Sequence, residues 1–226
     1  MKIPKVLEIL YEDDDLIFIN KPAGLVSQAT PDPNRPNVIS LLKTQFPSRD
    51  FFLHHRLDKD TSGVLLVGKT AGSNAALTNV FREHLINKVY LSLVLVKSDA
   101  AEIPASFTVD NHLAPVRGPQ KQLMRMVSVK KGGWKAETHF SFLKQLRNFA
   151  CIEARPVTGR THQIRVHLAG LKLPIAGDFL YGGKSSLVPR LMLHAKQLTL
   201  PHPISGNSIT VEAPLPSDFM TILEKG

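Results

Sequence analysis

Cysteine is nearly absent from this sequence of 226 residues, which contains one, Cys151. A single cysteine excludes an internal disulfide framework and is typical of a reducing compartment. Long apolar runs are missing as well: no apolar run of about 18 residues occurs, so the sequence predicts no membrane-spanning helix. Because residues 1–5 also lack the pattern of a secretory signal peptide, we expect a cytoplasmic protein that does not bind a membrane.

The sequence also lacks the motifs that bind common cofactors. It has no Walker pattern, no glycine-rich dinucleotide loop and no cysteine–histidine spacing typical of zinc. The segment Asp58-x-Asp60-x-Ser62-Gly63 resembles the first half of a calcium loop, but Lys69 stands where that loop needs a bidentate glutamate. The histidines that match no standard metal-site spacing are His54, His55, His162, His167 and His194. We therefore predict an activity that needs no metal and no other cofactor.

Acidic residues are missing from two long stretches. No Asp or Glu lies between Asp110 and Glu137, or between Glu153 and Asp178. Several cations occupy both stretches, and the chain has a net charge of +9. Segregated positive charge favours a phosphate-rich partner. An ordinary solvated basic surface explains the charge equally well, and charge alone does not separate RNA from DNA or from a membrane.

The composition is otherwise that of a globular protein, with 43% hydrophobic and 7% aromatic residues. A chain of this length suits one domain, and we predict a single domain over residues 1–226. Apolar alternation or continuous apolar runs predict strands at 6–11, 16–19, 90–96, 197–200 and 208–211, and two further strands are marked by Phe140, Phe142, Ile152 and Ala154. Tyr90 is expected on the face of its strand opposite Leu91, Leu93 and Leu95.

Helices are predicted where apolar residues recur with helical spacing. One helix follows a cap at Asn37. A second spans residues 73–87 with Ser73 as its cap, and its inward-facing residues are Ala76, Val80 and Phe81. A third begins at a cap on Thr161, and its apolar stripe consists of Ile164, Leu168 and Leu171. A strand is the competing prediction for this last segment, because apolar and polar residues also alternate there.

Residues 115–135 are rich in glycine, proline and cations, and predict a long basic hairpin or loop. Taken with the expected strands and helices, this organisation indicates an α/β fold of the α+β type. We expect a mixed, largely antiparallel sheet flanked by helices.

The polar stretch 53–63 stands directly before the apolar run 64–67, which predicts a buried strand. A rigid element of this kind is where a catalytic group is best held. Within it, His55-Arg56-Leu57-Asp58-x-x-Thr61-Ser62-Gly63 resembles the signature of the RluA family of RNA pseudouridine synthases. Other segments that resemble the motifs of this family occur in the expected order at 20–24, 88–90, 155–168, 174–178 and 191–195. The resemblance covers nearly the whole chain.

The resemblance implies a pseudouridine synthase catalytic core with a central RNA-binding cleft. Such an enzyme breaks the N1–C1′ bond of a uridine and rejoins the uracil through C5. Asp58 is implied to act on the nucleoside, by covalent attack or by stabilising charge at C1′. A nearby guanidinium keeps such a carboxylate ionised, and the resemblance assigns it to Arg165. Tyr90 is implied to stack on the uracil. From the residues alone, Asp58 also fits a loop-capping carboxylate and Tyr90 a core tyrosine.

Further side chains are expected to contact the RNA, by resemblance or by charge. They are Arg56, Thr61, Lys88, Arg160, His162, Gln163, Lys121, Arg125, Lys130 and Lys131. Enzymes that act on a stacked base must flip it out, and Arg56 is implied to lie near the extruded base. Arg56 also fits an ordinary surface ion pair, and the Thr61 hydroxyl fits a bond within its own loop. Gln163 and His162 also fit a supporting position behind Arg165.

Two features depart from other members of the family. Lys172 ends the third helical segment, where relatives usually place a glycine, so the local turn is in question. The sequence begins at the core, so the additional RNA-binding module that precedes the core in larger relatives is expected to be absent.

We predict a monomeric enzyme that isomerises a specific uridine in structured RNA. The expected partner is a stem-loop of rRNA, of the large subunit above all, or of tRNA. The alternatives are a catalytically silent RNA-binding protein on the same fold and a protein that binds DNA.

Overall fold

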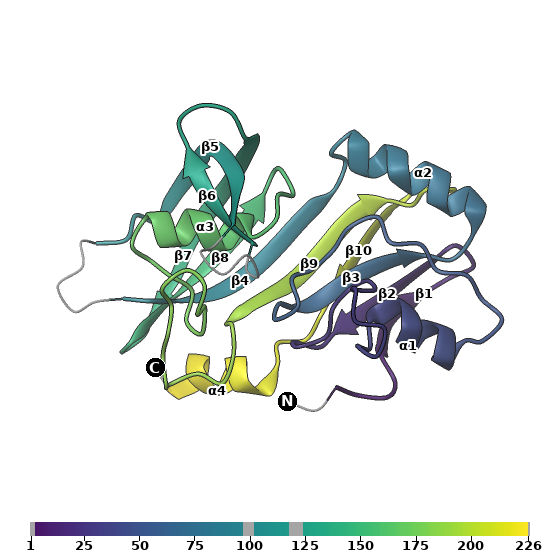
Figure 1. The fold of residues 1–226 in the computed structure, drawn as a ribbon, viewed down its shortest axis with the longest axis horizontal. Helices are drawn as coiled ribbons and strands as arrows, with labels where there is room; N and C mark the ends of the chain where they lie inside the picture. The colour runs from purple at the N-terminus through teal and green to yellow at the C-terminus, as the bar shows by residue number, and fades with distance from the viewer. Residues whose placement is uncertain (1–2, 97–101, 118–123, 226) are drawn as a thin grey trace. The chain divides into compact units, whose positions relative to one another are not determined.

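The computed structural model describes residues 3–96, 102–117 and 124–225 (Figure 1). The chain forms two compact units, Met1–Lys88 with His194–Leu215, and Val89–Leu193 with Pro216–Gly226. The predicted fold class is confirmed, because both units combine helices with largely antiparallel strands. The single domain over residues 1–226 stays a prediction. No helix in the described part of the chain is both long and apolar enough to cross a membrane.

The first unit contains strands paired in the order β1-β2-β3-β9-β10. Their bounds are β1 Glu8–Glu12, β2 Leu16–Lys21, β3 Ser62–Gly68, β9 Leu193–Pro201 and β10 Ser208–Glu212. All of these pairs are antiparallel except β3–β9, which is parallel where Ser62 and Gly63 lie beside His194 and Ala195. The helices of this unit are α1, Val38–Gln45, and α2, Ala71–Arg82.

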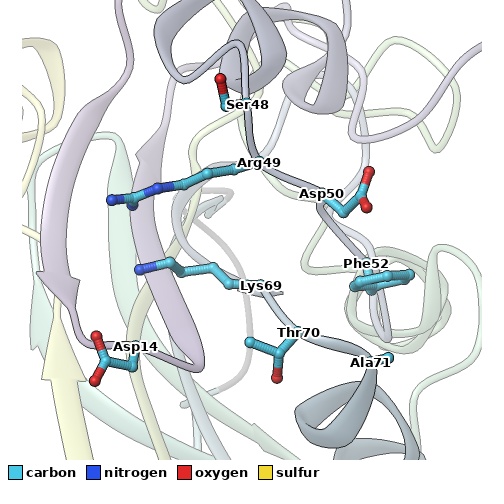
Figure 2. A pocket seen from close by; sticks show the side chains of 8 residues that line it. All are labelled: Asp14, Ser48, Arg49, Asp50, Phe52, Lys69, Thr70 and Ala71. Carbon is cyan, nitrogen blue, oxygen red and sulfur yellow. The ribbon is translucent and has the colours of Figure 1, made fainter.

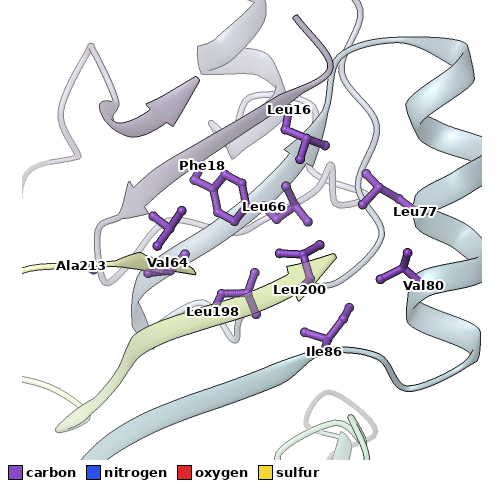
Figure 3. Packing of buried hydrophobic residues seen from close by; sticks show 11 residues of the cluster. Leu16, Phe18, Val64, Leu66, Leu77, Val80, Ile86, Leu198, Leu200 and Ala213 are labelled. Carbon is purple, nitrogen blue, oxygen red and sulfur yellow. The ribbon is translucent and has the colours of Figure 1, made fainter. Parts of the chain in front are cut away.

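A hydrophobic core forms between α2 and the strands of the first unit. Every residue of β3 is buried, which agrees with its continuous apolar sequence. Figure 3 shows Leu77 and Val80 of α2 facing apolar side chains of the strands, among them Leu66 and Leu200. Each fully buried side chain of this size contributes about 1.5–3 kcal/mol to folding. The core thereby fixes β3, the strand that follows the polar stretch 53–61.

Helix α2 starts earlier and ends earlier than the predicted span 73–87. Its cap is Thr70, not Ser73, because the Thr70 hydroxyl accepts the backbone N–H of Ser73 and the Ser73 hydroxyl accepts that of Thr70. The helix ends at Arg82, before His84 adopts the left-handed conformation with φ of 56°. Of the residues predicted to face inward, Val80 is buried, Phe81 is partly buried and packs against the core, and Ala76 is half-buried. Leu77, which was not predicted, is buried as well.

The second unit contains strands paired in the order β4-β8-β7-β5-β6, all antiparallel. Their bounds are β4 Asn87–Leu95, β5 Ser106–Arg117, β6 Met124–Val129, β7 Trp134–Gln145 and β8 Phe149–Pro156. The basic hairpin expected within 115–135 is confirmed as the β5–β6 pair, although its connection, 118–123, lies outside the described residues. The helices are α3, Gln163–Gly170, and α4, Ser217–Lys225.

Helix α3 confirms the helical alternative for the third segment but not its details. The cap is His162 rather than Thr161; His162 is left-handed with φ of 56°, and its side chain makes no capping bond. Ile164 and Leu168 are buried as expected, whereas Leu171 is 44% exposed. Leu171 misses the apolar stripe because the last helical residue is Gly170.

The end of α3 places Lys172 in the left-handed region with φ of 62°. The Lys172 and Leu173 N–H groups donate to the carbonyls of Ala169 and Leu168, both at 3.0 Å, which closes the helix in a Schellman arrangement. In this position a Cβ atom costs about 1–2 kcal/mol and glycine none. A conformation that favours glycine is thus adopted here by lysine.

Lys172→Gly is expected to raise the free energy of unfolding by about 0.5–1 kcal/mol, since relief of strain exceeds the entropy that glycine adds to the unfolded chain. Urea denaturation measures the change. Lys172→Ala is the control, because it removes the charge and keeps the Cβ atom, and it should not stabilise. Equal stabilisation by both variants would show that the charge, not the backbone, is the cause.

Candidate active site

The loop that carries Asp58 is held by its own backbone and by Ser27. The Leu57 N–H donates to the Ser27 hydroxyl at 3.2 Å, and that hydroxyl donates to the Leu57 carbonyl at 2.9 Å. On the other side, the Thr61 N–H donates to the Asp58 carbonyl at 3.1 Å. Leu57 and Thr61 are buried, whereas Asp58 is partly exposed. The backbone around Asp58 is therefore fixed while its side chain stays near the surface.

Lys21 fixes the residue that follows Asp58. Its fully buried ammonium group donates to the Lys59 carbonyl at 3.1 Å and to two nearer carbonyls, those of Pro22 and Leu25, at 2.9 and 2.8 Å. The Gly24 N–H reaches the same Lys59 carbonyl at 2.8 Å. A buried charge is unfavourable unless it is fully hydrogen-bonded. This lysine therefore holds the segment 22–25 and the Asp58 loop in one arrangement.

Sequence reasoning placed 20–24 in the family pattern but missed the physical role of Lys21 and Ser27. A signal was present, since Lys21 ends a strand that begins with four apolar residues, just before Pro22 and Gly24. A cation in that position must find acceptors, and the irregular backbone after it supplies carbonyl groups.

The start of β3 anchors the far end of the loop. The Ser62 hydroxyl and His194 Nδ1 lie 2.9 Å apart, and both side chains are buried. Gly63 has φ of 113°, and a Cβ atom on it would lie 2.1 Å from the Ala195 carbonyl oxygen. Only glycine fits such a position, which explains the glycine that ends the loop signature.

His55 is a structural residue of the loop. Its Nε2 accepts the Leu66 backbone N–H at 3.0 Å, and its ring stacks on Phe81 at 5.2 Å between centroids. Burial, reinforced by the charge of Lys88, lowers the pKa of His55 to about 3. The imidazole is thus neutral near pH 7 and carries its proton on Nδ1. Burial also lowers the pKa of Lys88.

In the second unit, Arg165 on α3 forms a two-point ion pair with Asp178. Its Nε and Nη2 atoms donate to the two carboxylate oxygens at 2.7 and 2.9 Å. The Asp178 side chain is fully buried and that of Arg165 is 12% exposed. The same carboxylate also accepts the N–H groups of Leu180 and Tyr181, at 3.1 and 3.2 Å. Asp178 thereby fixes the direction of the guanidinium.

Tyr181 connects Arg165 with the basic hairpin. Its ring lies 5.1 Å from the Arg165 guanidinium carbon and 5.9 Å from that of Arg125. Its hydroxyl accepts the Met126 N–H at 2.8 Å and lies 2.9 Å from His162 Nδ1. Helix α3, the loop 177–183 and strand β6 therefore share one network, which sequence reasoning did not anticipate.

Gln163 secures the segment before α3. Its amide oxygen accepts from the Thr158 hydroxyl at 2.7 Å and the Arg160 N–H at 3.0 Å. Its amide nitrogen donates to the Glu137 carbonyl and the Thr138 hydroxyl, both at 2.9 Å. Gln163 is 4% exposed, so its amide group is occupied by hydrogen bonds within the unit. They hold the backbone from which Arg160 extends to the surface.

Residues 15–170 match the sequence model of the family described as RNA pseudouridylate synthase. The chain belongs to this family. This RNA pseudouridylate synthase is therefore an isomerase that converts uridine in RNA to pseudouridine.

The synthase resembles curated relatives over nearly its whole length. The ribosomal large subunit pseudouridine synthase D of Xanthomonas campestris is 36% identical over 96% of this chain and 68% of its own. The ribosomal large subunit pseudouridine synthase C of Rickettsia felis is 38% identical over 93% of this chain and 68% of its own. The solved structure of human RNA pseudouridylate synthase domain containing 1 matches with a TM-score of 0.77 and 26% identity, covering 96% of this chain and 87% of that one.

The remaining predicted residues of the synthase lie on both units. Tyr90 is partly buried on β4, opposite Ala154 of β8. Asp58 belongs to the first unit and Tyr90 and Arg165 to the second, and their common role stays a prediction. Among the residues predicted to contact RNA, the exposed ones are Arg56, Arg125, Lys130, Lys131 and Arg160. Lys121 lies outside the described residues.

A surface pocket of about 490 Å³ in the first unit is separate from these residues (Figure 2). It is lined by Asp14, Ser48, Arg49, Asp50, Phe52, Lys69, Thr70 and Ala71. Figure 2 shows the Arg49 and Lys69 side chains pointing the same way, and both pair with the carboxylate of Glu12. The two cations thus share one carboxylate, and none of the predicted site residues lines the pocket.

Proposed function

We propose that the protein converts a uridine of ribosomal RNA to pseudouridine, and that Asp58 is the catalytic carboxylate. The support for ribosomal RNA is the likeness to synthases C and D, whose names place them on the large ribosomal subunit. The observation that carries the role of Asp58 is the loop around it, which Ser27 and Lys21 hold on both sides while the Asp58 side chain stays partly exposed. A nucleophile must be positioned in this way to act.

The reaction is balanced without an added reactant. The N1–C1′ bond breaks, the uracil turns, and C5 forms the new bond to C1′; C5 then gives up its proton, and N1 gains one. In this scheme Asp58 attacks the nucleoside or stabilises charge at C1′, and Tyr90 stacks on the uracil. Arg165 is proposed as the third member of the catalytic set. The pair with Asp178 gives Arg165 the fixed direction that such a role needs.

The exposed cations of the second unit are proposed to bind RNA phosphates. Lys130 and Lys131 stand in the turn between β6 and β7, and the exposed Arg125 and Arg160 belong to the same unit. Replacing both lysines with glutamine is expected to weaken RNA binding and to flatten its salt dependence by about one unit per lost phosphate contact. Affinity measured at several salt concentrations gives this slope.

The matched control is the pair Lys144 and Arg147, which are exposed at the opposite end of β7. Their replacement with glutamine removes the same charge and should leave the slope nearer to that of the unchanged protein. Equal slopes for both double variants would mean that total charge, rather than the β6–β7 turn, governs binding.

The target is tested by offering the purified protein unmodified ribosomal RNA and unmodified tRNA, each labelled with tritium at C5 of uridine. Loss of tritium from ribosomal RNA alone is the expected result. Loss from tRNA alone would overturn the proposed target and place it in a tRNA stem-loop.

A further inference from the structure

Phe179 is unusually exposed for an aromatic side chain. Its exposed fraction of 73% is the largest among the large hydrophobic side chains of the described residues. Phenylalanine is ordinarily buried, and a single exposed one needs an explanation only if its setting is distinctive. The setting here is distinctive in its rigidity and in its charge.

The loop that presents Phe179 is rigid. The Gly177 N–H donates to the Gly183 carbonyl, and the Gly183 N–H donates to the Asp178 carbonyl, both at 2.7 Å. A Cβ atom on Gly177 would lie 1.8 Å from the Arg190 carbonyl oxygen, so the backbones are in close contact. The residue before Phe179 is Asp178, whose buried carboxylate accepts four hydrogen bonds. The fixed backbone therefore keeps the Phe179 side chain exposed to solvent.

The charge around this loop is positive. Tyr181, two residues after Phe179, lies against the guanidinium groups of Arg165 and Arg125. Lys184 is exposed just beyond it. The one carboxylate of the loop, that of Asp178, is fully buried and engaged by Arg165. An exposed aromatic ring on a loop whose neighbouring residues include exposed or ring-stacked cations suits an unpaired nucleotide, because the ring stacks on a base while cations attract phosphates.

We propose that Phe179 is a binding residue that stacks on an unpaired base of the RNA substrate. The proposal rests on the proposed function, since it assumes that RNA reaches the Arg165 network. It adds that the substrate presents an unpaired base to the second unit. A protein partner with an apolar groove is the other possible occupant, but it gives no reason for the surrounding cations.

The test compares wild type with Phe179→Leu and Phe179→Tyr, using an unmodified large-subunit ribosomal RNA transcript as the probe. Stacking is worth enough per base that Phe179→Leu should raise Kd on the order of tenfold, while Phe179→Tyr should stay within about twofold. The slope of log Kd against log salt should not change, because stacking releases no counterions. Leu143→Ala, at a 50% exposed side chain on β7, is the control and should bind as wild type.

Three results would overturn the proposal. The first is wild-type affinity for Phe179→Leu. The second is a flatter salt slope in that variant, since this would mean that Arg125 or Arg165 had been displaced. The third is an equal loss of affinity in Leu143→Ala, which would make the effect a general one of surface apolarity. Since the readout is binding, it stands apart from turnover: absence of tritium release by wild type would contradict the proposed function whatever Phe179 does.

Discussion

Asp58→Asn lowers the rate of pseudouridine formation by at least about 10³-fold and leaves RNA affinity close to that of wild type. The substitution keeps the shape of the side chain but removes the charge that attacks or stabilises C1′. The loop should persist, because hydrogen bonds to the backbone of residues 57–61, made by Ser27, Lys21 and the loop itself, hold it. Single-turnover assays with excess enzyme measure the chemical step, and a filter-binding titration measures affinity.

Asp60→Asn is the matched control for this prediction. Asp60 is an exposed residue with a carboxylate in the same loop, two residues from Asp58. Asp60→Asn removes the same charge from the loop but leaves Asp58 in place, so activity near wild type is expected. Substantial turnover by Asp58→Asn would remove Asp58 from the catalytic role. A comparable loss in Asp60→Asn would mean that the charge of the loop, not the position of one carboxylate, matters.

Asp178→Asn is expected to lower the free energy of unfolding by about 3–5 kcal/mol and to reduce activity in the protein that remains folded. The mostly buried Arg165 guanidinium would keep its positive charge but lose the negative charge of Asp178. Leaving one partner of a buried ion pair charged in this way is costly in free energy. The guanidinium would also lose its fixed direction. Urea denaturation gives the stability, and assays well below the melting temperature give the activity of the folded fraction.

A second two-point pair in the same unit separates stability from function. Arg190 donates to both carboxylate oxygens of Asp218 at 2.7 Å, and the Arg190 side chain is 6% exposed. Asp218→Asn should also destabilise the protein, by less because Asp218 is partly exposed, and should leave the activity of the folded fraction unchanged. If both variants lose activity in proportion to stability, the orientation of Arg165 has no separate role.

Elements with a strong local pattern were predictable from sequence. The apolar run of β3 and the alternation of β4 produced strands near the expected positions, and the glycine- and cation-rich segment produced a hairpin. Boundaries were less predictable. Thr70 and Ser73 both fit the cap of α2 by residue type, and Thr70 is the cap, in a capping box with Ser73. His162 took a left-handed conformation, which is uncommon for any residue except glycine even though histidine adopts it more often than most.

The candidate site was predictable as residue types and much less as contacts. Asp58, Tyr90 and Arg165 came from the resemblance. Lys21 holds the Asp58 loop and Asp178 holds Arg165, across 38 and 13 residues of sequence, and short-range patterns contain no information about such pairs. Lys21 and Asp178 are a buried cation and a buried anion, and each lies in a segment that was noted for its family resemblance only.

The most direct test of the central claim is release of tritium from C5-labelled uridine in unmodified large-subunit ribosomal RNA, with wild type and Asp58→Asn assayed in parallel. The account predicts release by wild type, which approaches a fixed small number of tritium atoms per RNA, and none above background by Asp58→Asn. Tight RNA binding without release by wild type would contradict it and would favour the catalytically silent RNA-binding alternative.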